Sequence, residues 1–359
     1  MVTPALKREF KKNNVPLIPL GAGSRRMVAE MAGTSEDVEV VIGAGFHDTE
    51  ADAATLSGST VADQSDVSPP KVSLKKKDAL FPAFTLKLDI ASCPVLSHHI
   101  LNGKPVVPFA LALEWLGNGA LHANPGLLLT GFEDMRVLSG IRLDNDSKGL
   151  KVMVGKPVRK DSAFEIDVQL HDSDPENRRV YYAAKAVLSS GYDSPPVFSA
   201  PPALFEKNYK KGVDELYGPV LFHGTALHGI KDVASCSKEG IKVFASGAPS
   251  PRNWIKQPVR NTWLADPLVI DSAFQAAIVW CHENAGMVSL PVGFRSFRQY
   301  RPSFQKEGTV IVLEIKEQSG RKIKGDVTFL DSNNEKEVVA RMLGYEAIMD
   351  KSLEAAFKS

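Results

Sequence analysis

The sequence predicts an α+β protein made of two similar halves, each an antiparallel sheet wrapped around one buried helix. Two long and largely apolar segments, Val107–His122 and Pro267–Gly286, predict the helices, and each begins at or close to a proline. Four stretches with strand-like patterns follow each helix. Because the order and approximate spacing of these elements repeat, the sequence indicates a degenerate internal duplication whose two sheets could pool their cores.

The individual elements follow from local patterns. A first strand is predicted where Phe84, Leu86, Leu88 and Ile90 alternate with polar residues, which is the period of a half-buried strand. The helix Val107–His122 is apolar on nearly all sides, so we expect it to be buried, and the Asn-Pro-Gly that follows would end it. The later strands are expected at 127–138, 150–158, 164–172 and 179–190 in the first half, and at 288–294, 309–317, 324–331 and 337–349 in the second.

Composition excludes several classes of protein. The 359 residues include 43 Lys+Arg and 42 Asp+Glu, a formal net charge of +1, which gives no indication of binding to nucleic acid or to a membrane surface. No segment approaches the roughly 20 apolar residues of a membrane span. The three cysteines, Cys93, Cys236 and Cys281, lack CxxC spacing, which is typical of reduced thiols and argues against zinc. We therefore expect a cytoplasmic protein.

The chain changes character near residue 78. The residues before it form a short strand-helix-strand pattern and then a small, polar, Pro/Ser-rich stretch of linker composition. Gly21-Ala-Gly23 lacks the third glycine of a dinucleotide-binding fingerprint, so it gives little support for a bound cofactor. The predicted boundaries are 1–46 for the N-terminal fragment, 47–77 for the linker, 78–190 for the first half, 191–214 for a connector, 215–350 for the second half and 351–359 for a tail.

Ionisable residues lie at the start of both predicted helices. His98 and His99 precede the first helix, whereas Asp271 and Gln275 lie four residues apart on one face of the second, where the amide can orient the carboxylate. A histidine near an apolar helix is more often structural or capping than catalytic, and Asp271 could simply cap its helix. The pairing of a histidine in one half with a carboxylate in the other favours a site with a base and an acid.

Four motifs then resemble one known family, the dehydratase domains of polyketide synthases, in the family's own order. They are the HxxxGxxxxP pattern at His99, Gly103 and Pro108, the DxxxQ pattern at Asp271 and Gln275, a YGPxF-like segment at Leu216–Gly224, and an LPxxW-like segment at Leu290–Val292. The chain is most similar to the dehydratase-like domain of polyunsaturated-fatty-acid synthases. The resemblance implies a double hotdog fold. The fragment at 1–46 resembles the end of a ketoreductase domain. Because the fragment lacks the rest of that fold, we do not expect it to bind NADPH.

The resemblance implies a lyase of fatty acid or polyketide biosynthesis, which removes water from a 3-hydroxyacyl thioester to give a 2-enoyl thioester. His99 would be the base, Asp271 the acid held by Gln275, and the Gly103 N–H would bind the thioester oxygen. The substrate would be carried on the phosphopantetheine of an acyl carrier protein, with no metal and no cofactor of the domain's own. Neighbouring ketoreductase and ketosynthase domains are the other expected partners. Orienting or pocket roles would belong to Tyr217, Pro108, Gly218, Pro219, Leu290 and Pro291.

Two departures from the family pattern concern the pocket. Val220-Leu221 adds a residue within the YGPxF-like segment, and Gly293-Phe294 replaces the polar residue and tryptophan of the LPxxW loop. Either could change the contacts or the shape of the pocket, while the acid and the base remain.

Other functions remain open from the sequence. A hotdog thioesterase, a product-template-like cyclase and a non-catalytic scaffold domain could share the fold. His223 and His228 could line the pocket, although structural roles are favoured. Arg295, Arg298 and Arg301 could meet an acidic carrier protein, but a solvated face is the simpler interpretation.

Overall fold

The computed structural model describes residues 80–122, 124–144, 147–199, 208–305 and 307–357. The predicted ketoreductase-like remnant (1–46) and linker (47–77) lie outside the described residues. None of the helices in the described part is long and apolar enough to cross a membrane.

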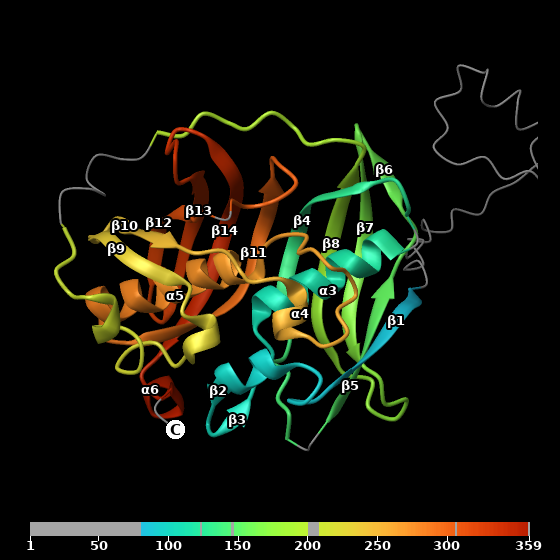
Figure 1. Ribbon diagram of the computed structural model, residues 1–359, viewed down its shortest axis with the longest axis horizontal. Coiled ribbons are helices and arrows are strands. Elements are labelled where there is room, and N and C mark those ends of the chain that lie inside the picture. The colour runs from blue at the N-terminus through green and yellow to red at the C-terminus, as the bar shows by residue number, and fades with distance from the viewer. Residues whose placement is uncertain (1–79, 123, 145–146, 200–207, 306, 358–359) are drawn as a thin grey trace, which may run out of the picture. The chain divides into compact units, whose positions relative to one another are not determined.

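One continuous antiparallel sheet of 12 strands forms the framework (Figure 1). Its strand order is β1-β5-β7-β8-β4-β11-β14-β13-β12-β10-β9, and β6 pairs with β7. The strands of the first half are β1 (Phe81–Leu88), β4 (Leu128–Val137), β5 (Lys148–Val154), β6 (Val158–Lys160), β7 (Ala163–Asp172) and β8 (Val180–Ser189). Those of the second half are β9 (Ile230–Cys236), β10 (Gly240–Ala245), β11 (Val288–Gln299), β12 (Thr309–Ser319), β13 (Lys322–Asp331) and β14 (Val338–Asp350).

The two halves meet at strands β4 and β11, each of which is the first strand after a long helix. These strands pair in antiparallel register, with Phe294 opposite Met135 and Phe297 opposite Phe132. The order of strands away from this seam is equivalent on the two sides, β8-β7-β5 and β14-β13-β12. The predicted duplication is therefore present, and the two sheets are fused into one rather than lying separately side by side.

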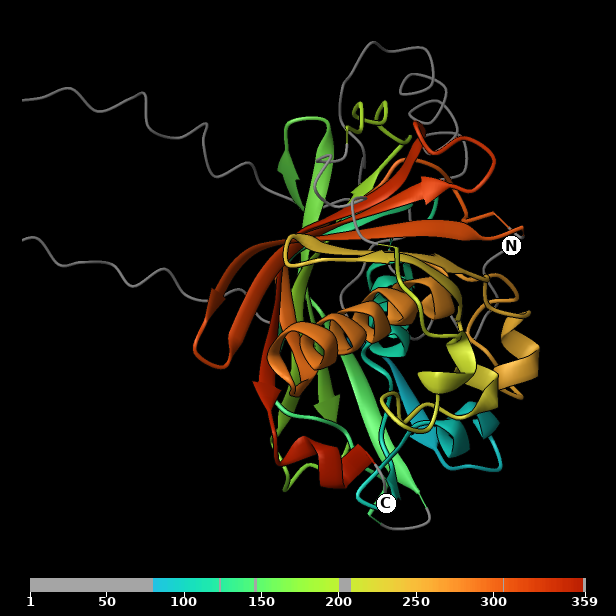
Figure 2. The same cartoon turned by 90° about the vertical axis from the view of Figure 1, so that its left-hand side faces the viewer.

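The long helices α3 (Phe109–His122) and α5 (Pro267–Ala285) lie on the same face of this sheet, one in each half (Figures 1 and 2). The side chain of Asp266 accepts the N–H groups of Leu268 and Val269 at 3.1 Å each and so caps the start of α5. Gly286 ends α5 in the left-handed conformation at φ 62°. Both helices are almost entirely buried, as the sequence predicts.

Aromatic rings join the two helices at the centre of the molecule. Phe109 of α3 stacks on Phe274 of α5, with ring centroids 5.1 Å apart, and on Tyr182 of β8 at 5.7 Å. Phe274 in turn stacks on Tyr345 of β14 at 5.6 Å. This stack fixes how closely the starts of the two helices approach each other.

Several short elements were not predicted. The strand pair β9 and β10 extends the second sheet beyond β12. Strands β2 (Ile100–Leu101) and β3 (Lys104–Pro105) form a separate hairpin, and the C-terminal helix α6 (Leu353–Phe357) packs Phe357 against Phe222 at a centroid distance of 4.4 Å. The remaining short helices are η1 (Pro94–His98), η3 (Val213–Glu215), η4 (Thr225–Leu227) and α4 (Pro251–Trp254).

Candidate active site

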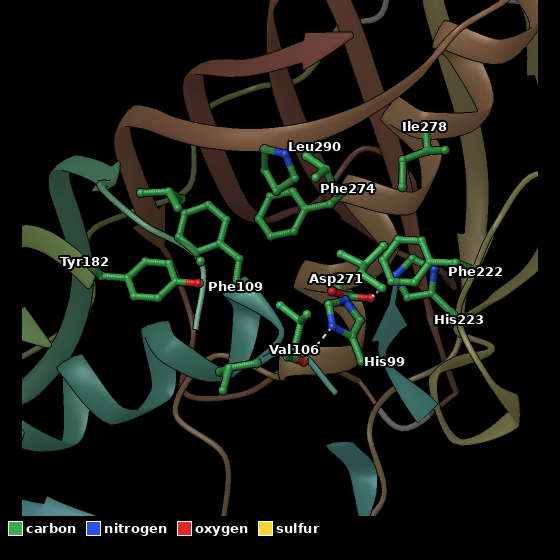
Figure 3. A pocket seen from close by; sticks show the side chains of 15 residues that line it. His99, Val106, Phe109, Tyr182, Phe222, His223, Asp271, Phe274, Ile278 and Leu290 are labelled. Carbon is green, nitrogen blue, oxygen red and sulfur yellow. Dashed lines mark hydrogen bonds and ion pairs between the residues drawn. The ribbon is translucent and has the colours of Figure 1, made fainter. Parts of the chain in front are cut away.

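A cavity of about 110 Å³ lies between the starts of the two long helices (Figure 3). Most of its walls are apolar, but three ionisable side chains, His99, His223 and Asp271, converge at one end of it. The apolar lining residues are Leu101, Val106, Val107, Phe109, Val137, Phe222, Phe274, Ile278, Leu290 and Pro291, and Gly140 and Tyr182 complete the wall. The arrangement suits a mostly apolar substrate whose reacting atoms are polar.

Two hydrogen bonds join His99 to Val106, on the far side of the β2–β3 hairpin. Its Nδ1 lies 2.8 Å from the carbonyl oxygen of Val106, and its own carbonyl accepts the Val106 N–H at 2.9 Å. Because a carbonyl oxygen can only accept, Nδ1 carries the proton, so that Nε2 keeps a free lone pair. Burial lowers the pKa of His99 to about 4, against a smaller opposing effect of this hydrogen bond. His99 is therefore a neutral imidazole at neutral pH.

His98 differs from its neighbour in both position and contacts. It ends the short helix η1 and does not line the cavity, and its carbonyl accepts the Gly224 N–H at 2.8 Å. His98 thus lies at the end of a helical turn and outside the cavity wall, whereas His99, the next residue, lines the cavity.

Asp271 lies in the second turn of α5 and faces the cavity. The amide Nε2 of Gln275, one turn further on, donates to Oδ2 of Asp271 at 2.8 Å and to the carbonyl of Leu227 at 2.9 Å. Burial raises the pKa of Asp271 to about 7, and the hydrogen bond from Gln275 opposes this rise. The side chain is therefore protonated for part of the time near neutral pH, as the apolar helix predicts.

Tyr217 belongs to the support of this carboxyl group rather than to the cavity wall. Its hydroxyl donates to Oε1 of Gln275 at 2.7 Å and accepts the N–H of Ile230 at 2.9 Å. Because Oε1 of Gln275 is occupied in this way, Nε2 of the same amide is the group turned to Asp271. Of the orienting and pocket roles expected for Tyr217, its position behind Gln275 fits the orienting one.

Gly103 does not line the cavity. Its predicted role, binding the thioester oxygen through its N–H, would require it to lie there. It is exposed at the tip of the β2–β3 hairpin, where Asn102 and Gly103 have φ values of 51° and 67°. Two successive residues with positive φ form the tight turn that Asn-Gly sequences favour in hairpins. The glycine is therefore explained by the turn, and its N–H is not placed to bind a thioester oxygen in the cavity.

The remaining predicted pocket residues divide into two groups. Leu290 and Pro291 line the cavity. Pro108 is buried just before α3, where its carbonyl accepts the N–H groups of Leu111 and Ala112. Gly218 and Pro219 are exposed and do not line the cavity.

His223 is the site residue for which the sequence favoured only a structural role. Its Nε2 lies 3.4 Å from Oδ2 of Asp271, and its ring lies 5.3 Å from that of His99 between centroids. A backbone bridge between His99 and His223 brings the two segments together from 124 residues apart in the chain, by subtraction of their numbers. No local sequence pattern predicts a contact between residues so far apart in the chain. His228, the other histidine of this segment, instead stacks on Tyr217 at 3.8 Å.

The three converging residues are also types that can ligate metals, and their nearest donor atoms all lie within 4.8 Å of one another. A carboxyl group that is partly protonated near pH 7 is a poor ligand, because ligands bind metals in the deprotonated form. The absence of a metal remains a prediction from the sequence.

Comparison with known proteins shows what the chain is similar to. Residues 210–351, which cover the second half, match the family model described as the polyketide synthase dehydratase N-terminal domain. The dehydratase domain from the CurF module of the curacin polyketide synthase superposes with a TM-score of 0.58 at 16% identity, over 78% of this chain and 96% of that one. The dehydratase domain of a mycocerosic acid synthase-like polyketide synthase gives 0.57 at 19% identity, over 80% and 98%. These findings confirm the double hotdog fold and the predicted resemblance to polyketide synthase dehydratase domains.

A curated relative makes the comparison more specific. The chain is 26% identical over 329 residues to one of the subunits of the polyunsaturated fatty acid synthase of Thraustochytrium sp.. The match covers 89% of this chain but spans only 10% of that relative. The chain is thus similar to one part of a much longer synthase polypeptide.

Proposed function

We propose that this protein is a dehydratase that removes water from a 3-hydroxyacyl thioester carried on an acyl carrier protein, within a polyketide or polyunsaturated fatty acid synthase. The observation that carries the proposal is the meeting of His99 and Asp271, one from each half, at the polar end of an apolar cavity. Their predicted pairing as base and acid fits this placement.

His99 would abstract the proton from C2 of the substrate. The hydrogen bond from Nδ1 to Val106 fixes the ring and leaves the Nε2 lone pair available as the acceptor. Because burial holds the pKa of His99 at about 4, the imidazole is in its basic form throughout the neutral range. A positioned base of this kind typically contributes about 10²- to 10⁴-fold to the rate.

Asp271 would give its proton to the departing hydroxyl group. The electrons of the C2–H bond pass into the C2–C3 bond, the C3–O bond breaks, and the hydroxyl leaves as water with the proton of Asp271. A pKa of about 7 makes Asp271 a proton donor that is still substantially protonated near neutral pH. The proton taken up by His99 must return to Asp271, or exchange with solvent, before the next turnover.

The carbonyl oxygen of the thioester also needs a donor, because negative charge develops there as the proton leaves C2. Phe109 is the first residue of α3 and lines the cavity, and the first N–H groups of a helix have no partner within the helix. We assign this helix start, in place of Gly103, to the thioester oxygen. A single well-placed donor of this kind is worth about 3 kcal/mol in the transition state.

The carrier protein remains part of the proposal without an assigned docking surface. Of the three arginines that the sequence singles out, Arg298 is paired with Glu133, and Arg301 is paired with Asp331 at 3.0 Å and with Glu337. These pairs support the interpretation of the arginine stretch as a charged sheet surface, and only Arg295 of the three is exposed.

The test is to incubate the purified protein with a set of 3-hydroxyacyl carrier proteins of different chain lengths and to follow the acyl mass. Loss of 18 mass units, abolished in His99→Ala and retained in the matched control His98→Ala, is the expected result. Release of free acid would indicate a thioesterase, a cyclised product with a poly-β-keto substrate would indicate a cyclase, and no change with any chain length would favour a scaffold domain.

A further inference from the structure

His223 is a buried titratable residue to which the dehydration chemistry above gives no role. Its side chain is 5% exposed and lies against the catalytic pair of the proposed function, with Nε2 at 3.4 Å from Oδ2 of Asp271. Its other ring nitrogen, Nδ1, is fully buried and has no hydrogen-bond partner among the described residues. A group buried at this cost and turned toward the acid needs an explanation.

We propose that His223 is a positioning residue for the acid: its Nε2–H points at Oδ2 of Asp271, beside the amide of Gln275, and so confines the transferable proton of Asp271 to Oδ1. The part of this inference that concerns proton transfer rests on the proposed function. The part that concerns the tautomer of His223 and the proton of Asp271 does not.

The tautomer follows from the surroundings of the two ring nitrogens. A neutral imidazole carries one N–H, and burial keeps the pKa of His223 well below its usual value, so the ring is neutral. If the proton were on Nδ1, a buried N–H would have no acceptor among the described residues. With the proton on Nε2, the N–H faces the carboxylate and only a lone pair stays unpaired. The second arrangement is lower in energy, because an orphaned donor in apolar surroundings is costly.

The two oxygens of Asp271 are then chemically different. Oδ2 accepts from Gln275 at 2.8 Å and faces His223, whereas no hydrogen bond to Oδ1 occurs within the described ranges. Figure 3 shows the carboxyl group between the rings of His99 and His223. A proton on Oδ2 would compete with the hydrogen bond from Gln275 and would face the N–H of His223. The free oxygen, Oδ1, is therefore the one that holds the proton for the substrate.

The 3.4 Å separation is longer than a formed hydrogen bond, which is common for catalytic contacts before substrate binds. The backbone limits how far this distance can drift. His99 and His223 form an antiparallel bridge, and the Gly224 N–H donates to the carbonyl of His98 at 2.8 Å. A Cβ at Gly224 would lie 2.7 Å from His98 Nδ1, so the segments pack closely. The contact between these two segments therefore holds both His99, the proposed base, and His223, which orients Asp271.

Other titratable groups also face the Asp271–His223 pair. Besides His99, they are Tyr217 behind Gln275, Tyr345 of β14, and His228, whose Nε2 lies 3.1 Å from the carbonyl of His223. Burial raises the pKa of both tyrosines, so that both stay neutral up to pH 10. A change in the alkaline pH dependence on substitution of His223 can therefore be assigned to Asp271.

The experiment compares His223→Phe, which removes the N–H donor, with His223→Gln, which keeps one. We expect His223→Phe to lower kcat by about 10- to 100-fold, because the acid loses its orientation. Loss of a donor to the carboxylate also raises the pKa of Asp271, so the alkaline limb of kcat/KM should move up by about one pH unit. In His223→Gln the limb should stay in place and kcat should recover at least in part. Equal losses in both variants with an unmoved limb would overturn the proposal.

A second measurement needs neither activity nor a variant. ¹⁵N chemical shifts of selectively labelled histidine report the tautomer in the wild-type protein, and we expect the Nε2–H form for His223. The Nδ1–H form would contradict the proposal even if the enzyme is a dehydratase. If no substrate is dehydrated but the Nε2–H form is found, and ¹³C titration of Asp271 moves up in His223→Phe, the proposed function fails while the inference about His223 stands.

Discussion

The two buried helices each carry one buried carboxyl group, and Glu114 of α3 contrasts with Asp271 of α5, the proposed acid. Burial raises the pKa of both to about 7. Glu114 accepts the backbone N–H groups of Leu264 at 3.0 Å and Ala265 at 2.6 Å, which use both of its oxygens. Asp271 has one oxygen held and the other without a described partner, beside a cavity.

A perturbed pKa is therefore shared by a structural carboxyl group and a proposed catalytic one. Through its hydrogen bonds Glu114 holds the loop that leads into α5, so it links the two halves. It does not line the cavity. The free oxygen, the adjacent cavity and the imidazole across it distinguish Asp271. Burial alone does not identify the site.

The largest expected effect comes from the two adjacent histidines. His99→Ala should lower the dehydration rate by about 10³-fold or more, because the base is lost and no other lone pair is fixed at the same place. His98→Ala should keep most of the activity, since His98 does not line the cavity. Rates on a 3-hydroxyacyl carrier protein measure both. Equal losses in the two variants would show that the base has been assigned to the wrong residue.

The next effect is the dependence of kcat/KM on pH. His99 must be neutral, so activity should fall as pH drops through its pKa of about 4. Asp271 must be protonated, so activity should fall tenfold per unit as pH rises above its pKa of about 7. A bell-shaped profile between these limits is expected. Glu114→Gln should leave both limbs in place, and a shifted alkaline limb in that variant would assign the limb to the wrong helix.

Much of the fold and of the candidate site could be predicted from the sequence. The two helices are continuous apolar segments with a proline near the start, and Asp271 and Gln275 meet because residues four apart share a helical face. The spacing of the motif could not decide the role of Gly103. A glycine in an Asn-Gly turn and a glycine that binds a thioester oxygen have the same appearance in the sequence. His223 and Glu114 acquire their meaning from contacts made across the fold, which no local period encodes.

A smaller effect concerns stability. The pKa of Asp271 in the folded protein, about 7, lies above the value of about 3.9 in an unfolded chain. The folded state thus holds a proton that the unfolded state releases, and stability falls as pH rises between these values. Asp271→Asn should remove this penalty and raise the free energy of unfolding at pH 8 by up to about 4 kcal/mol, with little change at pH 4. Urea denaturation at both pH values is the measurement.

Glu114→Gln provides the matched comparison. Its amide NH₂ would face one of the two backbone N–H groups that the carboxyl group accepts, so we expect a loss of about 1 to 3 kcal/mol at pH 6. A gain in stability there would mean that the hydrogen bonds to the loop are not what holds Glu114 in place.

The smallest effect is expected at Gly103. An alanine there meets nothing within 4 Å but must adopt φ +67°. We expect Gly103→Ala to lower stability by about 1 kcal/mol and to change kcat by less than about twofold. Thermal unfolding and steady-state rates check this. A large loss of kcat with normal stability would indicate that Gly103 binds the thioester oxygen after all.

The central claim is that one half supplies the base and the other the acid for a single step. It is tested most directly by single-turnover dehydration of a 3-hydroxyacyl carrier protein in the wild type, His99→Ala, Asp271→Asn and the double variant, followed by loss of 18 mass units. We predict that each single change lowers the rate by at least about 10²-fold and that the double variant is little slower than the worse single one, because groups acting as a unit are not additive. A wild-type rate in either single variant would contradict the account.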